Sequence, residues 1–175
     1  MKTTKTQLAC LAAAALALSP PLLAQDRPVE MKFASWVPAQ HALAKTGFEP
    51  WARSVEAASA GSIKVAMFPA QQLGKANDHY DMARDGIAEI TYVNPGYQAG
   101  RFPIFSAGEL PFLMTQPGAG SAAFDAWYRK YSASEMKDVK VCLVHLHDPG
   151  ALHSKIKITD PAQIKGMKIR PAHAT

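Results

Sequence analysis

The sequence predicts an α/β fold built on a parallel sheet. Over residues 31–93, short apolar segments that alternate with period two are separated by longer segments with helical periodicity. The resulting order is strand, helix, strand, helix, strand, which is typical of crossover units on a parallel sheet. Proline and glycine lie at the boundaries between the segments, where the chain is expected to turn.

Local sequence justifies each of the first five elements. The apolar residues Phe48, Trp51 and Val55 recur at three- and four-residue steps, which predicts a helix that Pro50 kinks or divides. Asn77 is a suitable N-cap for the second helix. The expected strands in this region are residues 31–36, 63–67 and 87–93, and the expected helices are residues 42–59 and 77–84.

The second half of the chain is expected to be rich in loops. We predict an apolar plug at residues 110–113 and a helix over residues 121–134, which carries several aromatic side chains. Gly166 should break the chain before its last strand. The strands expected here are residues 139–146, 153–158 and 167–170, and a turn of helix is expected to begin at Asp160-Pro161.

The N-terminus has the pattern of a secretory signal. Two lysines precede an apolar run from Leu8 to Leu18, and Ala24 offers a small residue at a cleavage site. The run is too short to cross a bilayer, which disfavours a retained anchor. Lipidation at Cys10 is disfavoured because the apolar region follows that cysteine. We therefore predict a signal peptide over residues 1–24 and a periplasmic protein after its cleavage.

Composition narrows the classes of partner. The formal net charge is +5, and removal of the two lysines in the signal lowers it to +3. The basic residues are dispersed, which argues against a nucleic-acid partner. Only Cys142 remains after processing, so no internal disulfide is expected, as is typical of a bacterial periplasmic protein.

Polar and aromatic side chains follow the expected strands, where ligands bind in open parallel sheets. Arg170 ends the last strand with a planar, permanently charged fork that suits a carboxylate. Asn94 can donate and accept hydrogen bonds, and Trp36 can supply an aromatic wall. The predicted substrate-binding residues are Trp36, Gln72, Asn94, Tyr97, Arg170 and His173. Together they suit a small organic acid anion.

Three of these residues also have purely structural interpretations. Arg170 could form an ion pair at a strand end, Trp36 could belong to the core, and Asn94 could act only as a turn former before Pro95.

Catalysis and metal binding have little support. His145 and His147 could share one face of a strand and bind zinc, with Cys142 on the other face, but no second cluster of ligands follows. The chain lacks a Gly-x-Ser-x-Gly elbow, a phosphate loop and a His-Glu-x-x-His motif. We predict no catalytic residue, no metal and no cofactor.

Five short motifs, in this order, resemble the solute-binding subunit of tripartite ATP-independent periplasmic (TRAP) transporters, of the C4-dicarboxylate-binding type. The motifs are residues 31–34, 63–65 leading to 68–74, 85–89, 109–112 and 164–171.

The resemblance implies a periplasmic-binding-protein-like architecture, in which two α/β domains with parallel or mixed sheets close on a carboxylate. Residues 25–138 would form the first domain and residues 139–175 the start of a second, incomplete domain, because members of the family are considerably longer. Arg170 would be the substrate-carboxylate arginine, and Trp36, Asn94 and His173 would contact the cleft. The family often has Asn at positions 36 and 173 and Glu at position 94. The aromatic side chain of Trp36 indicates a ligand other than a minimal dicarboxylate.

The expected function is therefore to capture an organic acid anion and deliver it to the TRAP membrane permease subunits, driven by an ion gradient. The resemblance further implies a monomer that is not an enzyme. Two alternatives remain open. An exported α/β enzyme acting on a carboxylate-bearing substrate would need a nucleophile or acid–base pair near Arg170. A sensor domain with the same fold would need a transmembrane helix after it.

Overall fold

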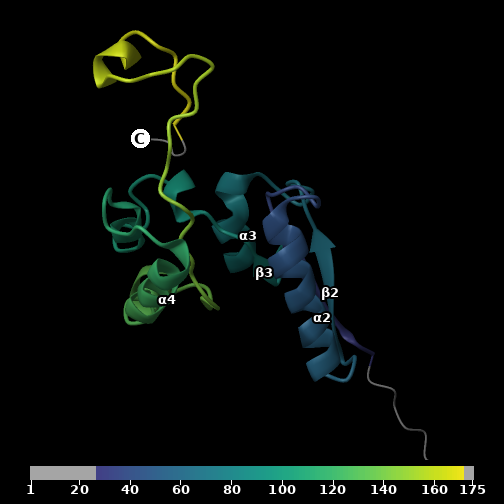
Figure 1. Cartoon of the computed structure of the whole chain (residues 1–175). Coiled ribbons are helices and arrows are strands. Elements are labelled where there is room, and N and C mark those ends of the chain that lie inside the picture. The colour runs from purple at the N-terminus through teal and green to yellow at the C-terminus, as the bar shows by residue number, and fades with distance from the viewer. Residues whose placement is uncertain (1–26, 172–175) are drawn as a thin grey trace, which may run out of the picture.

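The computed structural model describes residues 27–171, so the expected signal peptide and His173 lie outside the described residues (Figure 1). The strands are β1 (Val29–Ala34), β2 (Ile63–Phe68) and β3 (Ile90–Thr91). The helices and helical turns are η1 (Ala44–Phe48), α2 (Glu49–Ala58), η2 (Ala76–Asp78), α3 (His79–Arg84), η3 (Pro95–Tyr97), η4 (Phe105–Glu109), α4 (Pro117–Tyr128), α5 (Ser132–Glu135) and η5 (Pro161–Ile164). None of the described helices is long and apolar enough to cross a membrane.

The predicted α/β fold and parallel sheet are confirmed. The sheet has the order β2-β1-β3, and both pairings are parallel. β1 and β2 pair over their full length, from Val29 opposite Ile63 to Ala34 opposite Phe68. The third strand is shorter than predicted, because only Ile90 and Thr91 pair with β1, although the amide of Tyr92 still donates to the carbonyl of Ala34 at 2.9 Å.

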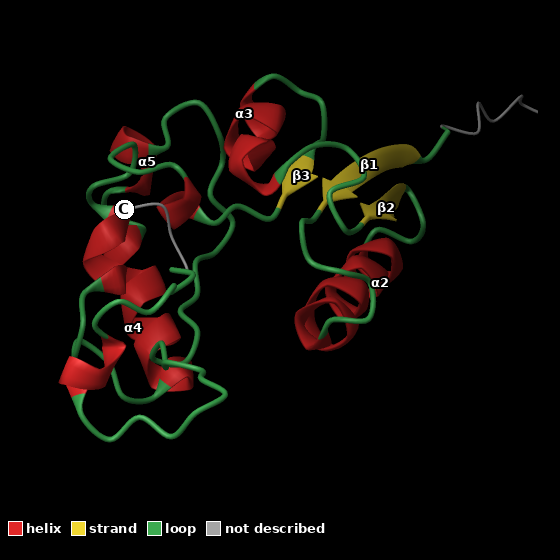
Figure 2. Cartoon of the chain, turned by 90° about the horizontal axis from the view of Figure 1, so that it is seen from above, coloured by secondary structure: helices red, strands yellow, loops and turns green. Residues whose placement is uncertain are grey.

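Helices cover both faces of the sheet (Figure 2). Period-two alternation in β1 sends Phe33 to one face, where it packs with Ala52 of α2 and Val65 of β2. The next residue, Ala34, faces the other side and packs with Met82 of α3 and Ala88. Phe33 and Ala34 are both buried, which fixes the register of the central strand.

Pro50 modifies the first helix without dividing it. Helical structure runs continuously over residues 42–58, and its middle turn, η1, is a π-helix that leads directly into α2. Proline lacks an amide hydrogen, and its ring clashes with the carbonyl four residues earlier in an α-helix. The wider π-helical turn directly before Pro50 accommodates the ring and the missing donor. The helix ends before Gly61, which has a left-handed φ of 79° and whose amide donates to the carbonyl of Glu56.

A second apolar cluster joins α3 to α4. It contains the buried residues Tyr80, Phe102, Phe105, Phe124, Tyr128 and Met136. The carboxylate of Glu135 organises its centre, since it accepts hydrogen bonds from the amides of Ile104 and Phe105 and, at 2.6 Å, from the hydroxyl of Tyr128. Burial and the neighbouring Glu135 raise the pKa of Tyr128, which keeps this phenol protonated as a donor.

Residues 139–146 were predicted as a strand, and this is wrong: the segment is extended but pairs with no described strand. Side chains of α4 satisfy its backbone instead. Asp125 accepts from the amide of Val144 at 2.9 Å, Ser121 accepts from the amide of Leu146 at 2.9 Å, and Arg129 donates to the carbonyl of Cys142 at 2.8 Å. Burial alone would raise the pKa of the Asp125 carboxyl. The hydrogen bonds from Val144 and Arg129 outweigh burial and hold this pKa below its usual value.

The predicted strands at 153–158 and 167–170 are also absent from the described structure. Both segments are almost entirely exposed, and no described strand lies beside either one to complete a ladder. The local signals between them are confirmed. Asp160 caps η5 in a capping box with Gln163, and Gly166 has φ of 82°.

The apolar plug predicted at residues 110–113 does not fill the core. Leu110 and Leu113 are exposed, and the side chain of Phe112 is 100% exposed at a left-handed φ of 64°. The aromatic residues of the second cluster already occupy the space between η4 and α4, since the Phe105 and Phe124 rings lie 5.3 Å apart.

Protonation of His79 is expected to destabilise the fold. This residue is completely buried, and its Nδ1 lies 3.0 Å from the carbonyl oxygen of Tyr92. Burial lowers the pKa of His79 below 6.5, and its backbone hydrogen bonds oppose this only in part. Because the folded-state pKa lies below the unfolded value, stability is fully present above the unfolded pKa and is lost as the pH falls toward the folded one.

We therefore expect the melting temperature to fall between about pH 7 and about pH 5. His79→Gln should have a lower melting temperature than the parent protein at neutral pH, but its melting temperature should fall less on acidification. Scanning calorimetry measures both. His153→Gln, which changes an exposed histidine, is the matched control and should follow the parent protein. An identical pH dependence in His79→Gln and the parent would contradict this role for His79.

Candidate functional site

An aromatic cluster lies at the carboxyl ends of β1 and β3. Trp36, two residues beyond β1, stacks on Tyr92, the residue after β3, with ring centroids 5.3 Å apart and planes 19° apart. Tyr97 meets Trp36 edge-on at 5.5 Å, and Phe48 packs against Tyr92 at 5.0 Å. Because β1 and β3 are parallel neighbours, this is the edge of the sheet where ligands bind in open α/β folds.

Tyr92 is held at three points. Its amide donates to Ala34, its carbonyl lies 3.0 Å from Nδ1 of His79, and its hydroxyl lies 3.1 Å from Nε2 of His145. The rings of Tyr92 and His145 are parallel within 4°, with centroids 5.8 Å apart. Burial raises the pKa of Tyr92 to about 12, so the phenol is neutral at physiological pH.

Trp36 belongs to this cluster and not to the fully buried core. Its side chain is half-buried, and its indole Nε1 is buried without a hydrogen-bond partner among residues 27–171. An unpaired buried donor costs about 1–3 kcal/mol. The cluster therefore contains a polar group whose hydrogen bond the described residues do not supply.

Asn94 acts as a turn former, as the structural interpretation expected. Its Oδ1 accepts a hydrogen bond from the amide of Gly96 at 3.1 Å and caps η3. The turn that it caps also carries Tyr97 to the edge of Trp36. Asn94 thus shapes the aromatic cluster, and a direct contact between Asn94 and a ligand stays a prediction.

The structure does not bring Gln72 into the aromatic cluster. Gln72 is exposed in the turn after β2, where its amide donates to the carbonyl of Pro69. The neighbouring Gln71 side chain is bonded to the amide of Ala76 at 2.9 Å.

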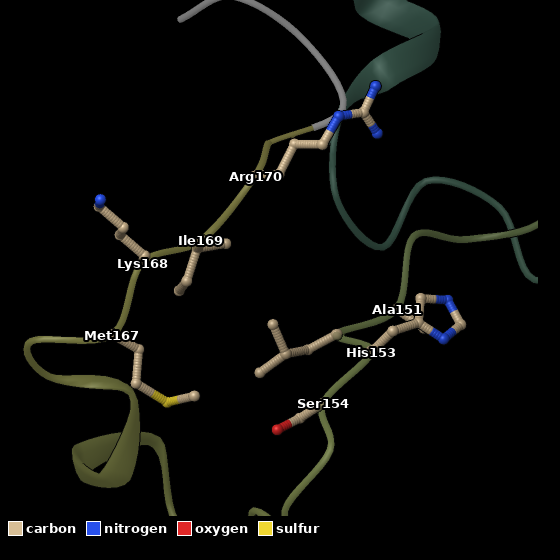
Figure 3. Close-up of a pocket in the computed structure, with 8 residues that line it drawn as sticks. Ala151, His153, Ser154, Met167, Lys168, Ile169 and Arg170 are labelled. Atoms are coloured by element: carbon tan, nitrogen blue, oxygen red, sulfur yellow. The ribbon is translucent and has the colours of Figure 1, made fainter.

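Arg170 lines a separate hollow of about 300 Å³ between two extended segments (Figure 3). Met167 and Ile169 point toward the facing segment, and the Arg170 guanidinium lies at one end. Arg170 is exposed and forms no ion pair with any described residue, so the ion-pair interpretation gains no support. The lining consists of Ala151, Leu152, His153, Ser154, Met167, Lys168, Ile169 and Arg170.

Sequence reasoning missed Tyr92 and gave His145 no binding role. Tyr92 was detectable, because period-two alternation places it on the same side of the chain as Asn94. His145 was weighed only as a zinc ligand or a packing residue. No group of three or more His, Cys, Asp or Glu side chains that could hold a metal occurs within the described part of the chain. The position of His145 beside Tyr92 depends on how α4 holds residues 139–147, which no local pattern shows.

Comparisons with known proteins point to one family. Residues 33–174 match the family model described as bacterial extracellular solute-binding protein, family 7. A TRAP solute-binding protein from an unidentified marine microbe is 39% identical, with a TM-score of 0.76 over 81% of this chain and 45% of its own. It is described as specific for aromatic acid ligands and was crystallised with 3-hydroxybenzoate.

Two further solved structures agree with this match. The TRAP solute-binding protein of Rhodoferax ferrireducens T118, solved with copurified benzoate, is 35% identical with a TM-score of 0.65, over 69% of this chain and 38% of its own. The TRAP solute-binding protein of Bordetella bronchiseptica, solved with bound (R)- and (S)-mandelate, is 29% identical with a TM-score of 0.62. The match covers 67% of this chain and 38% of the Bordetella protein. This chain thus spans less than half the length of each of the three.

Proposed function

The chain belongs to family 7 of the bacterial extracellular solute-binding proteins, the solute-binding subunits of TRAP transporters, and from this premise we propose that it captures an aromatic carboxylate. Members of this family are non-enzymatic components of transport in the periplasm. Delivery of the bound acid to a TRAP membrane permease, by a monomeric protein, follows as part of the proposal.

The aromatic cluster carries this proposal. A minimal dicarboxylate needs charged and polar partners at both ends, whereas the carboxyl ends of β1 and β3 present the rings of Trp36, Tyr92 and Tyr97. Aromatic rings pack favourably in stacked or edge-on arrangements, which suits a ligand with a ring. The three structural relatives bind benzoate, 3-hydroxybenzoate and mandelate, all of them acids that carry an aromatic ring.

Arg170 is the proposed partner of the ligand carboxylate. Its guanidinium is exposed, and no carboxylate among the described residues lies within ion-pair distance of it. A guanidinium can bind a carboxylate through two parallel hydrogen bonds, which fixes the orientation of the ligand as well as its charge. Asn94, Gln72 and His173 remain proposed contacts on the walls of the same cleft.

We also retain the division into two domains. Residues 25–138 would form the first domain, which contains the sheet and the second apolar cluster, and residues 139–175 would begin the other. Residues 139–147 would then cross from one domain to the other, held to α4 by Ser121, Asp125 and Arg129. On this arrangement Trp36 and Tyr92 stand on one wall of the cleft and Arg170 on the opposite wall.

Isothermal titration calorimetry on the whole protein tests the ligand class. We expect benzoate and 3-hydroxybenzoate to bind at least about tenfold more tightly than succinate, since each lost aromatic contact costs about 0.5–1.5 kcal/mol. Acid recovered from the complex should be chemically unaltered. Tight binding of succinate without binding of either benzoate would contradict the proposed ligand class, and a converted product would favour an enzyme.

A further inference from the structure

The hydroxyl of Tyr92 is an unusually well-fixed polar group within the aromatic cluster. The amide of Tyr92 donates to the carbonyl of Ala34, its carbonyl is bonded to Nδ1 of the His79 side chain, and its hydroxyl is bonded to Nε2 of His145. Its ring is nearly parallel to those of Trp36 and His145, with interplanar angles of 19° and 4°. A residue whose backbone, ring and hydroxyl all make fixed contacts is preorganised, which is the requirement for a group that selects among similar ligands.

The hydroxyl keeps hydrogen-bonding capacity after it has bonded to His145. A phenol has one donor and two acceptor positions. If Tyr92 donates to His145, both acceptor positions remain, and if the imidazole donates, one acceptor position remains together with the phenol hydrogen. Because the phenol is neutral and half-buried, an acceptor remains available for either tautomer of His145.

We propose that Tyr92, positioned by His145, selects aromatic acids whose ring carries a hydrogen-bond donor, such as a hydroxyl or amino substituent. Tyr92 would accept a hydrogen bond from that substituent, while its neighbours Trp36 and Tyr97 pack against the ring. His145 is a positioning residue, because it acts on the ligand through Tyr92. This inference rests on the proposed function, since it requires that an aromatic carboxylate occupies the cleft.

The buried indole Nε1 of Trp36 agrees with a polar substituent at this place. It has no hydrogen-bond partner among the described residues, although it belongs to the ring that stacks on Tyr92. Buried donors in proteins are almost always paired. We therefore expect the Trp36 indole N–H to bind an acceptor that the described residues do not provide, and the neighbouring ligand site is where such an acceptor would lie. A substituent hydroxyl has an acceptor as well as a donor, which an unsubstituted ring does not.

The test compares 3-hydroxybenzoate with benzoate by calorimetry on the whole protein and its variants. We expect the parent protein to bind 3-hydroxybenzoate about tenfold more tightly than benzoate, which corresponds to about 1.4 kcal/mol. Tyr92→Phe should weaken the affinity for 3-hydroxybenzoate about tenfold and leave the affinity for benzoate within about twofold of the parent value, so that the preference disappears. Tyr131→Phe, in a tyrosine outside the cluster, is the matched control and should leave the preference unchanged.

Substitution of His145 distinguishes a role in positioning Tyr92 from a role in stabilising the fold alone. His145→Phe keeps a ring beside Tyr92 but removes its hydrogen bond, and should reduce the preference for 3-hydroxybenzoate several-fold. His145→Gln keeps a polar partner for the hydroxyl and should restore most of it. A residue that only stabilised the fold would weaken both ligands equally, so the ratio of the two affinities is the informative quantity.

The outcomes separate this inference from the proposed function. If the parent protein binds both acids equally, or if Tyr92→Phe keeps the full preference, the role of Tyr92 is overturned while aromatic-acid binding stands. If the preference disappears in Tyr92→Phe but persists in His145→Phe, the positioning role of His145 is overturned. If the parent protein binds neither acid, both the inference and the proposed function are overturned.

Discussion

Arg170→Ala should reduce the affinity for an aromatic carboxylate by about 100-fold or more, equivalent to about 2.7 kcal/mol. The guanidinium is permanently charged and can form two parallel hydrogen bonds with the carboxylate. Arg170→Lys should retain charge without that geometry and should lose about tenfold. Calorimetry with benzoate measures both variants.

Lys168→Ala provides a matched control for this experiment. Lys168 lines the same hollow as Arg170, is exposed, and carries the same charge. If the effect of Arg170 were only that of net charge in this segment, both alanine variants would lose affinity equally. We expect Lys168→Ala to remain within about threefold of the parent protein, because screening weakens the influence of an exposed charge that does not touch the ligand. Unchanged affinity in Arg170→Ala would remove this arginine from the proposed site.

Glu135→Ala should destabilise the protein by about 3 kcal/mol. Its carboxylate accepts hydrogen bonds from the backbone amides of Ile104 and Phe105 and from the hydroxyl of Tyr128, which is completely buried. Removal of a shared acceptor leaves buried donors without partners, and each such donor costs about 1–3 kcal/mol. Solvent entering the partly buried site would offset part of the loss.

Urea denaturation followed by circular dichroism gives the free energy of unfolding of this variant. Glu135→Gln should lie between Glu135→Ala and the parent, because its amide oxygen can still accept while its amide nitrogen faces a donor. Glu30→Ala, at an exposed glutamate, should change stability by less than about 0.5 kcal/mol. If Glu135→Ala stayed within the same 0.5 kcal/mol, the cluster between α3 and α4 would not depend on this carboxylate.

The sheet was predictable because its signals are local. Alternation in residues 31–36 and 63–67, with Pro38 and Pro69 after them, defined β1 and β2 to within two residues. The same reasoning failed at residues 139–146, where an apolar segment that looks like a strand is paired by side chains of α4 instead of by another strand. Period-two alternation indicates which side chains are buried. It does not indicate which groups form hydrogen bonds with the backbone amides and carbonyls.

The candidate site was predictable only in part, for a related reason. The rule that ligands bind beyond strand ends selected Trp36 and Tyr97, which the structure places in contact. Tyr92 lies within the segment that was predicted as the third strand, so its place at the strand end became evident only when pairing ended at Thr91. His145 reaches Tyr92 across 53 residues of sequence, and no spacing rule covers such a contact.

Cys142 offers a means of following the cleft in solution. Its thiol is free and exposed, and it lies three residues before His145 in the extended segment that Arg129 anchors through the carbonyl of Cys142. The other cysteine of the sequence, Cys10, lies in the predicted signal peptide. Among residues 25–175, a thiol-reactive fluorophore would therefore attach at Cys142, within the segment that is proposed to join the two domains. Changes in its emission on addition of benzoate would report closure of the cleft without a second label or an engineered cysteine.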